Sequence, residues 1–199
     1  SAELEPRDRL IVETLIKLER FDVSGNSKWE GAVNRYAKAV RGTEEHLDIV
    51  QKFSVKAECP ALLEDILAKP QGAQAANSTK LILTLGSAEL LDTALSEADE
   101  KQSTALLGLL GFIKHKESAR LLEAYLPNAK NAALRKKAAN ALLQVGDESQ
   151  KEFARKHLGN SANPEGINAK VDIEALSKRK GDPIKGKAAY MKVCFACHK

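Results

Sequence analysis

Short helical stretches separated by helix start and stop signals are the feature that most constrains this chain. Between Pro6 and about His157, apolar residues recur every three or four positions, and no stretch shows the alternation of apolar and polar residues typical of a strand. Gly42, Gly86 and Gly146 each follow such a stretch, as expected of a glycine that ends a helix. The pattern predicts an all-α fold for this part of the chain.

Capping signals indicate where several of these helices begin. Ser27 with Glu30, and Asp147 with Gln150, have the spacing of a capping box, in which two side chains satisfy the free N–H groups of a helix start. Pro60 fits the first turn of another helix, where a backbone N–H is not needed. We therefore expect helices to begin near these three positions.

Two helix-turn-helix units in the second half of the chain are spaced alike. Residues 109–126 superpose on residues 141–158 at an offset of 32 residues, and an earlier unit around Gly86 matches less closely. A period of this size is typical of a helical repeat array, because one two-helix unit cannot bury its apolar face alone. The predicted architecture is an α-solenoid of helical hairpins over residues 1–158.

The stretch AALRKKAANALLQVGDESQKEFARKHL resembles the HEAT-like repeats also found in bilin-lyase-type proteins. The resemblance lies in the pattern formed by Leu134, Arg135, Ala138, Ala139, Ala141, Leu142, Gly146 and Asp147. It implies an α-solenoid of HEAT-like hairpins. It does not imply lyase activity, because such repeats serve many functions.

The composition changes after His157. The stretch LGNSANPEGINAK is rich in Gly, Asn, Ser and Pro, so residues 159–180 are predicted to be a linker with a short helix over 172–178. Asp182 and Pro183 then suit the N-cap and first position of a new helix, which begins a separate unit over residues 181–199.

This last unit carries a Cys-x-x-Cys-His motif. Two thiols three residues apart, followed by an imidazole, suit covalent attachment of haem c: Cys194 and Cys197 form the thioethers, and His198 is the proximal ligand of the haem iron. The motif arises by chance in about one in a thousand chains of this composition. A zinc half-site would need a second pair of ligands, and a thioredoxin-like redox pair would need a βαβ context; neither is evident.

The stretch GDPIKGKAAYMKVCFACHK resembles the start of a class I cytochrome c. The resemblance implies that Gly186 and Tyr190 pack where the first helix of such a domain crosses the last. The second axial ligand in that family is usually a methionine several dozen residues further on. The single methionine here, Met191, precedes Cys194 by three residues and cannot easily reach the far face of the haem.

The unit is therefore expected to be the N-terminal stub of a c-type cytochrome domain, with a truncated first helix, and the chain to be a fragment of a larger protein. Haem c is expected in the full-length protein. It is expected to be absent or incomplete in the fragment, because attachment needs export and a maturation system.

Helical repeats followed by a haem c domain resemble large exported multidomain haem-binding and dehydrogenase-like proteins of planctomycetes, verrucomicrobia and Bacteroidetes. The resemblance implies a periplasmic or extracellular location, with the signal peptide outside this chain. It also implies a redox protein or an upstream dehydrogenase domain as partner. The predicted function is a scaffold that positions a c-type haem domain for electron transfer. The alternative is a protein–protein interaction solenoid with no haem function.

Other function classes find little support in the sequence. There is no Ser/His/Asp set and no Gly-rich phosphate loop, so no catalytic site is predicted within the repeats. Residues 178–199 hold seven Lys or Arg residues against Asp182 alone, a charge that can steer an acidic partner. They lack the interleaved aromatics of a nucleic-acid reader, and no apolar run approaches the ~20 residues of a membrane span.

The remaining cysteine and histidines are predicted to be structural. Cys59 precedes Pro60 at a helix start and is expected to be a small buried apolar residue. His46, His115 and His157 occur singly near helix ends or turns, and are expected to be solvated or capping residues rather than ligands.

Overall fold

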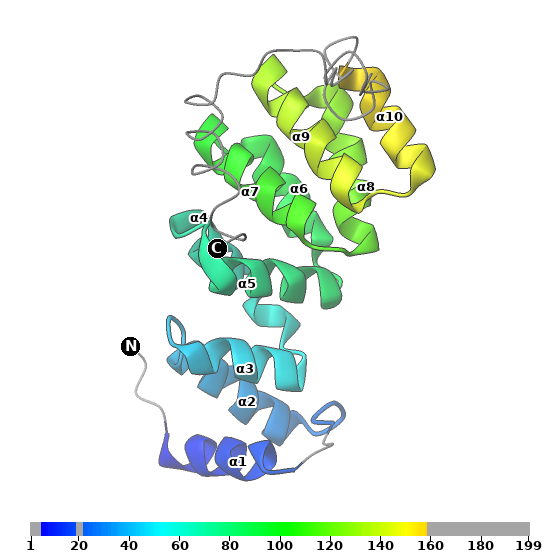
Figure 1. Ribbon diagram of the computed structural model, residues 1–199. Coiled ribbons are helices and arrows are strands. Elements are labelled where there is room, and N and C mark those ends of the chain that lie inside the picture. Colours follow the sequence, from blue (N-terminus) through cyan, green and yellow to red (C-terminus); the bar gives the residue numbers. More distant parts are fainter. Residues whose placement is uncertain (1–4, 19–21, 159–199) are drawn as a thin grey trace, which may run out of the picture. The chain divides into compact units, whose positions relative to one another are not determined.

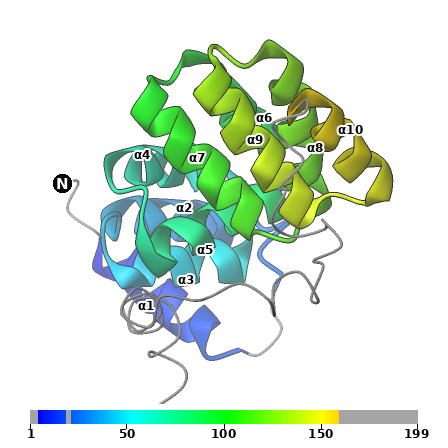
Figure 2. The same cartoon turned by 45° about the horizontal axis from the view of Figure 1, so that its top comes forward.

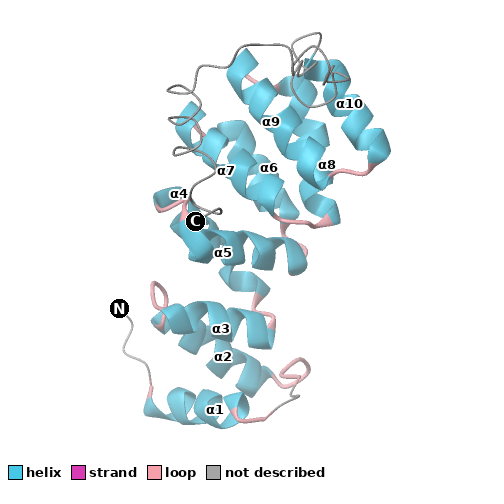
Figure 3. Cartoon of the chain, viewed as in Figure 1, coloured by secondary structure: helices cyan, strands magenta, loops and turns pink. Residues whose placement is uncertain are grey.

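The computed structural model describes residues 5–18 and 22–158, and every regular element in them is a helix (Figure 1, Figure 3). No strand occurs in these residues, so the predicted all-α fold is confirmed for them. The helices belong to a unit that spans residues 1–159. The predicted linker helix and cytochrome-like helix lie outside the described residues.

The α-helices are short, from 10 to 14 residues. The elements in chain order are α1 (Pro6–Ile16), α2 (Ser27–Ala39), α3 (Glu44–Phe53), the 3-10 helix η1 (Lys56–Glu58), α4 (Cys59–Ala68), α5 (Gly72–Thr84), α6 (Ala88–Glu97), α7 (Glu100–Phe112), α8 (Lys116–Tyr125), the 3-10 helix η2 (Leu126–Asn128), α9 (Ala132–Val145) and α10 (Glu148–Leu158). None of the described helices is both long and apolar enough to cross a membrane.

Two of the predicted caps can be compared with the structure directly. The box at the start of α10 is confirmed: the Gln150 N–H donates to Asp147 Oδ1 at 2.9 Å, and the Asp147 N–H donates to Gln150 Oε1 at 3.1 Å. The box predicted for α2 is wrong by one residue. Asn26 is the N-cap, and its side chain accepts a hydrogen bond from the Trp29 N–H, so Ser27 is the first helical residue. Asparagine and serine are similarly good caps, so neighbouring candidates compete.

From α4 onward, each helix packs on the second helix along the chain. In one row α5 contacts α7 and α7 contacts α9; in the other, α4 contacts α6, α6 contacts α8 and α8 contacts α10. With the exception of α5 and α6, consecutive helices also pair, most extensively α9 with α10. The helices α7 and α9 lie side by side in both views (Figure 1, Figure 2). Helices α4–α10 therefore form two rows.

The helix starts repeat along these rows. Helices α7 and α9 begin 32 residues apart, at Glu100 and Ala132, and α8 and α10 begin at the same offset. Helices α5 and α6 begin 28 residues before α7 and α8, respectively. The offset between the two similar stretches of sequence is thus also the offset between two successive helix pairs.

The first three helices pack in chain order, α1 on α2 and α2 on α3. An ion pair ties α1 to α2: Arg35 donates two hydrogen bonds to the Asp8 carboxylate, at 2.6 and 2.9 Å. Asp8 is buried, and the hydrogen bonds from Arg35 hold the pKa of its carboxyl below the ordinary value despite that burial. A buried carboxylate is therefore matched by a bidentate partner on the neighbouring helix.

The backbones of α7 and α9 approach each other closely at Gly111. Gly111 is buried, and a Cβ built on it would lie 2.7 Å from the Cβ of Ala141 and 2.9 Å from its Cα. The two backbones therefore meet with only the Ala141 methyl group at the contact. Fully buried leucines flank this contact on both helices, namely Leu110 and Leu142. Each such side chain contributes roughly 1.5–3 kcal/mol through burial.

Replacing Gly111 by alanine tests this contact. The new methyl group would overlap Ala141, and we expect Gly111→Ala to lower the free energy of unfolding by about 1–3 kcal/mol, as overpacked cores do. Urea unfolding followed by circular dichroism measures the change.

The matched control is Gly108→Ala, one turn earlier on the same helix. Its Cβ would meet only the end of the Lys137 side chain, at 3.6 Å or more. Here the better helix propensity of alanine is expected to raise stability by up to about 1 kcal/mol. Equal effects of the two substitutions would contradict a tight contact at Gly111.

Candidate functional site

The residues predicted to hold haem lie outside the described part of the chain. These are Cys194, Cys197 and His198, together with the two residues assigned to the helix crossing, Gly186 and Tyr190. Haem attachment therefore stays a prediction from the sequence.

The third cysteine and two of the histidines have clear structural roles. Cys59 is fully buried, as predicted, and burial raises the pKa of its thiol. His115 caps α8, also as predicted: its Nδ1 accepts a hydrogen bond from the Glu117 N–H at 3.2 Å. His46 differs from the prediction, because its side chain is buried rather than solvated and does not cap a helix.

His46 belongs to a buried ion cluster with Arg41 and Glu58. Arg41 follows α2, His46 lies in α3, and Glu58 ends η1. Arg41 donates two hydrogen bonds to the Glu58 carboxylate, at 2.6 and 2.9 Å, and Nε2 of His46 lies 3.2 Å from Oε2 of the same carboxylate. Glu58 is fully buried, whereas the Arg41 side chain remains 45% exposed. The cluster joins three elements that are separate in sequence.

The charge of Glu58 depends on these partners. Burial by itself raises the pKa of the Glu58 carboxyl, but the hydrogen bonds and charge of Arg41, helped by His46, bring it below the ordinary value of 4.5. Both carboxylate oxygens are already occupied by protein donors. The cluster therefore suits a structural role better than a catalytic one. Among the described residues, no group of three or more His, Cys, Asp or Glu side chains could hold a metal ion.

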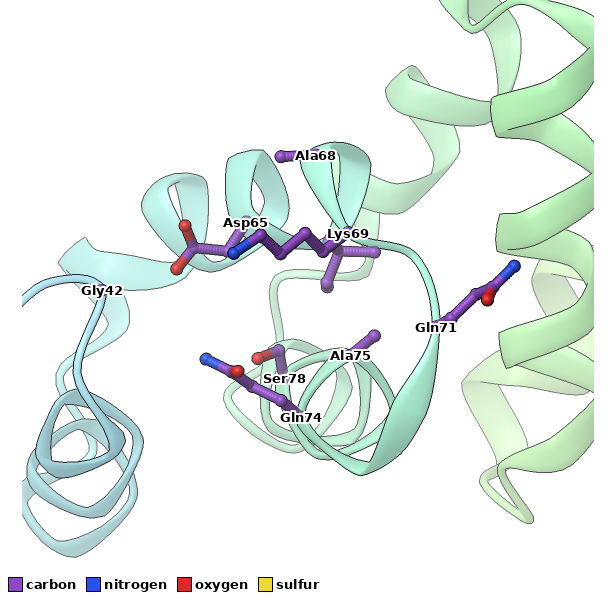
Figure 4. Close-up of a pocket in the computed structure, with 9 residues that line it drawn as sticks. Gly42, Asp65, Ala68, Lys69, Gln71, Gln74, Ala75 and Ser78 are labelled. Atoms are coloured by element: carbon purple, nitrogen blue, oxygen red, sulfur yellow. The ribbon is translucent and has the colours of Figure 1, made fainter.

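A polar pocket of about 190 Å³ lies between α4 and α5 (Figure 4). It is lined by Gly42, Asp65, Ile66, Ala68, Lys69, Gln71, Gln74, Ala75 and Ser78. Figure 4 shows Asp65 and Lys69 on one side and Gln74 and Ser78 on the other, while Gln71 points away from them. The pocket offers hydrogen-bond donors and acceptors to a small polar molecule. Its lining contains neither histidine nor cysteine, the commonest general base and the most nucleophilic side chain.

A larger groove of about 790 Å³ lies along α7 and is called here the α7 groove. It is lined by Pro70, Gln71, Gly72, Glu100, Lys101, Thr104, Ala105, Gly108, Leu109, Phe112 and Lys137. These residues come from the segment that joins α4 to α5, from the start of α5, from one face of α7, and from α9. Phe112 is 76% exposed, the largest exposed fraction among the big hydrophobic side chains described.

Sequence reasoning did not find the α7 groove, although a signal was present. Lys101, Ala105, Gly108 and Phe112 follow one another at intervals of four, three and four residues, which places them on one face of a helix. An aromatic residue on a face with lysine and small residues is unusual for a core stripe. The groove itself also needs residues from two other elements, which no local pattern reveals.

No protein-family model matches the chain, and neither a curated protein nor a solved structure matches it. The function is therefore inferred from the sequence motifs and the geometry. The Cys-x-x-Cys-His motif lies at the end of the sequence. The geometry is that of residues 5–18 and 22–158.

Removing Arg41 tests the buried ion cluster. Arg41→Ala leaves the Glu58 carboxylate buried without its main partner, and we expect it to lower the free energy of unfolding by about 3 kcal/mol near pH 7. Because Glu58 has a lowered pKa in the folded state, its ion pair stabilises the fold above pH 4.5, and this contribution is lost as the pH falls through that lowered pKa. The difference between wild type and variant should therefore shrink in acid.

The control is Arg9→Ala, which breaks an exposed pair with Glu13 on the surface of α1. Exposed pairs of this kind contribute about 0–1 kcal/mol. Chemical unfolding at a series of pH values measures both variants. A loss for Arg41→Ala that is small, or that does not depend on pH, would contradict the assignment.

Proposed function

We propose that residues 1–158 form an α-solenoid of HEAT-like helical hairpins that serves as a scaffold for a c-type haem segment in electron transfer. The observation that carries the scaffold part is the two-row packing of α4–α10, in which each helix contacts the second helix along the chain. Repeat arrays pack in this way because each hairpin buries its apolar face on its neighbours. The 32-residue offset between successive hairpins gives further support.

The haem part of the proposal rests on the chemistry of the donor set. Cys194 and Cys197 supply the two thiols for thioether bonds, and His198 supplies an imidazole for the iron. When bound, haem c supplies a one-electron redox centre. Gly186 and Tyr190 would then pack at the crossing of the first and last helices of a cytochrome domain.

This function would place the chain in the periplasm or outside the cell, where c-type haem is attached. Its partner would be a redox protein or an upstream dehydrogenase domain. The lysines and arginines of residues 178–199 suit docking to an acidic surface near the haem. Cys59, His115 and His46 have structural roles, which agrees with electron transfer rather than catalysis at the repeats.

The second candidate function is a protein-interaction solenoid with no haem. The α7 groove favours it, because an exposed aromatic residue beside a groove of this size is a common feature of binding surfaces. Binding at the groove would not by itself exclude haem attachment, since the two use different residues.

Hydrogen exchange in the Gly111→Ala variant tests the solenoid. In a one-dimensional array a local defect weakens its neighbours first, so amides in α7 and α9 should lose protection while those in α1 and α2 keep theirs. Mass spectrometry of peptic fragments measures the protection of the amides in each helix. A loss of protection spread evenly over all helices would indicate a single cooperative core instead.

Haem attachment is tested by exporting this chain in a host that matures c-type cytochromes. We expect one haem per chain that survives denaturing electrophoresis, and none in Cys194→Ala combined with Cys197→Ala. Haem staining and intact mass measure attachment, and an absorption spectrum identifies the haem.

The control is Cys59→Ala, which removes the buried cysteine outside the motif and should leave attachment unchanged. Wild-type chain that is exported, folded and free of covalent haem would overturn the haem part of the proposal. It would leave the interaction solenoid as the function.

A further inference from the structure

The α7 groove combines three features that point to one kind of ligand: an exposed aromatic side chain, a floor of small residues, and lysines without acidic partners. We propose that it binds an acidic amphipathic segment of another protein, with apolar side chains seated on the floor and carboxylates paired with Lys101 and Lys137. The inference does not depend on haem binding or on the repeat architecture.

The apolar part of the groove centres on the C-terminal half of α7. Phe112 is 76% exposed, so its ring contributes little to the core of its own unit. Leu109, one turn earlier, lies at the base of the groove and is almost buried. An apolar side chain laid between them would remove a large aromatic surface from water, which is the main driving force of association.

The floor of the groove lies close to the backbone of α7. Gly108 has no side chain and Ala105 has only a methyl group, and both line the groove. The only atoms within 4 Å of a Cβ built on Gly108, beyond its own neighbourhood in α7, belong to the Lys137 side chain. A ligand side chain that takes the place of the flexible Lys137 chain end can therefore approach the helix axis more closely here than over a longer residue.

The charged part of the groove is basic. Lys137 is exposed, and its Nζ lies 3.6 Å from the position that a Gly108 Cβ would take, so its ammonium group borders the floor of the groove. Among the described residues, no carboxylate lies within 4.0 Å of Lys137 or of Lys101, and Glu100 is the only acid in the lining. A carboxylate on the ligand would supply the missing partner.

Charge also argues against two other occupants. Residues 178–199 of this chain carry seven Lys or Arg residues and one acid, so they would meet the groove lysines with like charge. A second copy joined through the same groove would bring Lys101 and Lys137 towards their counterparts. An acidic segment with apolar residues at helical spacing satisfies both the floor and the lysines.

The test selects ligands from a displayed library of random peptides of about 16 residues, or four helical turns. The full chain is the bait. We expect the selected peptides to be rich in Asp and Glu and to carry Leu, Ile or Phe at spacings of three and four. Their affinity, measured by fluorescence anisotropy, should fall as salt is raised, because ion pairs at an open groove are screened.

Variants assign the binding to the groove. Phe112→Ser and Lys137→Glu should each weaken the selected peptides by about tenfold or more, as loss of a central anchor does. Gly108→Leu fills the floor without changing any charge and should weaken them as well. The matched controls, Leu10→Ser and Lys38→Glu, alter an exposed leucine and an exposed lysine on other helices and should leave binding unchanged.

Three outcomes would overturn the proposal. The first is a selection that yields no binding peptide or only basic ones. The second is a set of peptides that bind the groove variants as tightly as wild type. The third is a dimer in sedimentation experiments that Phe112→Ser dissociates, which would assign the groove to a second copy of the chain. None of these results bears on haem attachment, which is measured separately.

Discussion

The contact of Gly111 with Ala141 fixes the spacing between α7 and α9, and other features of the unit depend on that spacing. With only the Ala141 methyl group at the contact, α9 lies close enough to α7 for the end of the Lys137 side chain to reach Gly108. Helices α8 and α10 both pack on α9, so the position of α9 also affects theirs. One glycine thus sets a packing distance in the core and also brings a wall of the α7 groove into place.

The features that the sequence predicted well are those that depend on residues three or four apart. The box of Asp147 with Gln150 needs only those two side chains and a helix start, and the structure has it. The Asn26 cap was missed in favour of Ser27 because both residue types suit the position, and only the path of the chain before α2 decides between them. Helix identity and repeat offset were therefore predictable, while individual boundaries moved by a residue.

The features that the sequence did not predict depend on contacts between distant residues. Arg41 and Glu58 are 17 residues apart, and His46 joins them from a third element, so nothing local distinguishes this histidine from a solvated one. The α7 groove takes residues from positions as far apart as Pro70 and Lys137. The haem motif is the opposite case, because its donors are consecutive in sequence. It could be recognised without a fold, and it lies outside the described residues, so the described helices do not test it.

Within α7, two glycines one turn apart have opposite surroundings. Gly111 is buried against α9, where any larger residue would collide, so packing alone explains it. Gly108 has no such constraint, and alanine there would favour the helix by up to about 1 kcal/mol. An exposed Phe112 is similarly of little use to the unit's own core. Gly108 and Phe112 are unfavourable for an isolated helical unit, but both become favourable once an apolar side chain of a ligand lies in the groove. Their joint presence on one face of α7 is therefore better explained by binding than by folding.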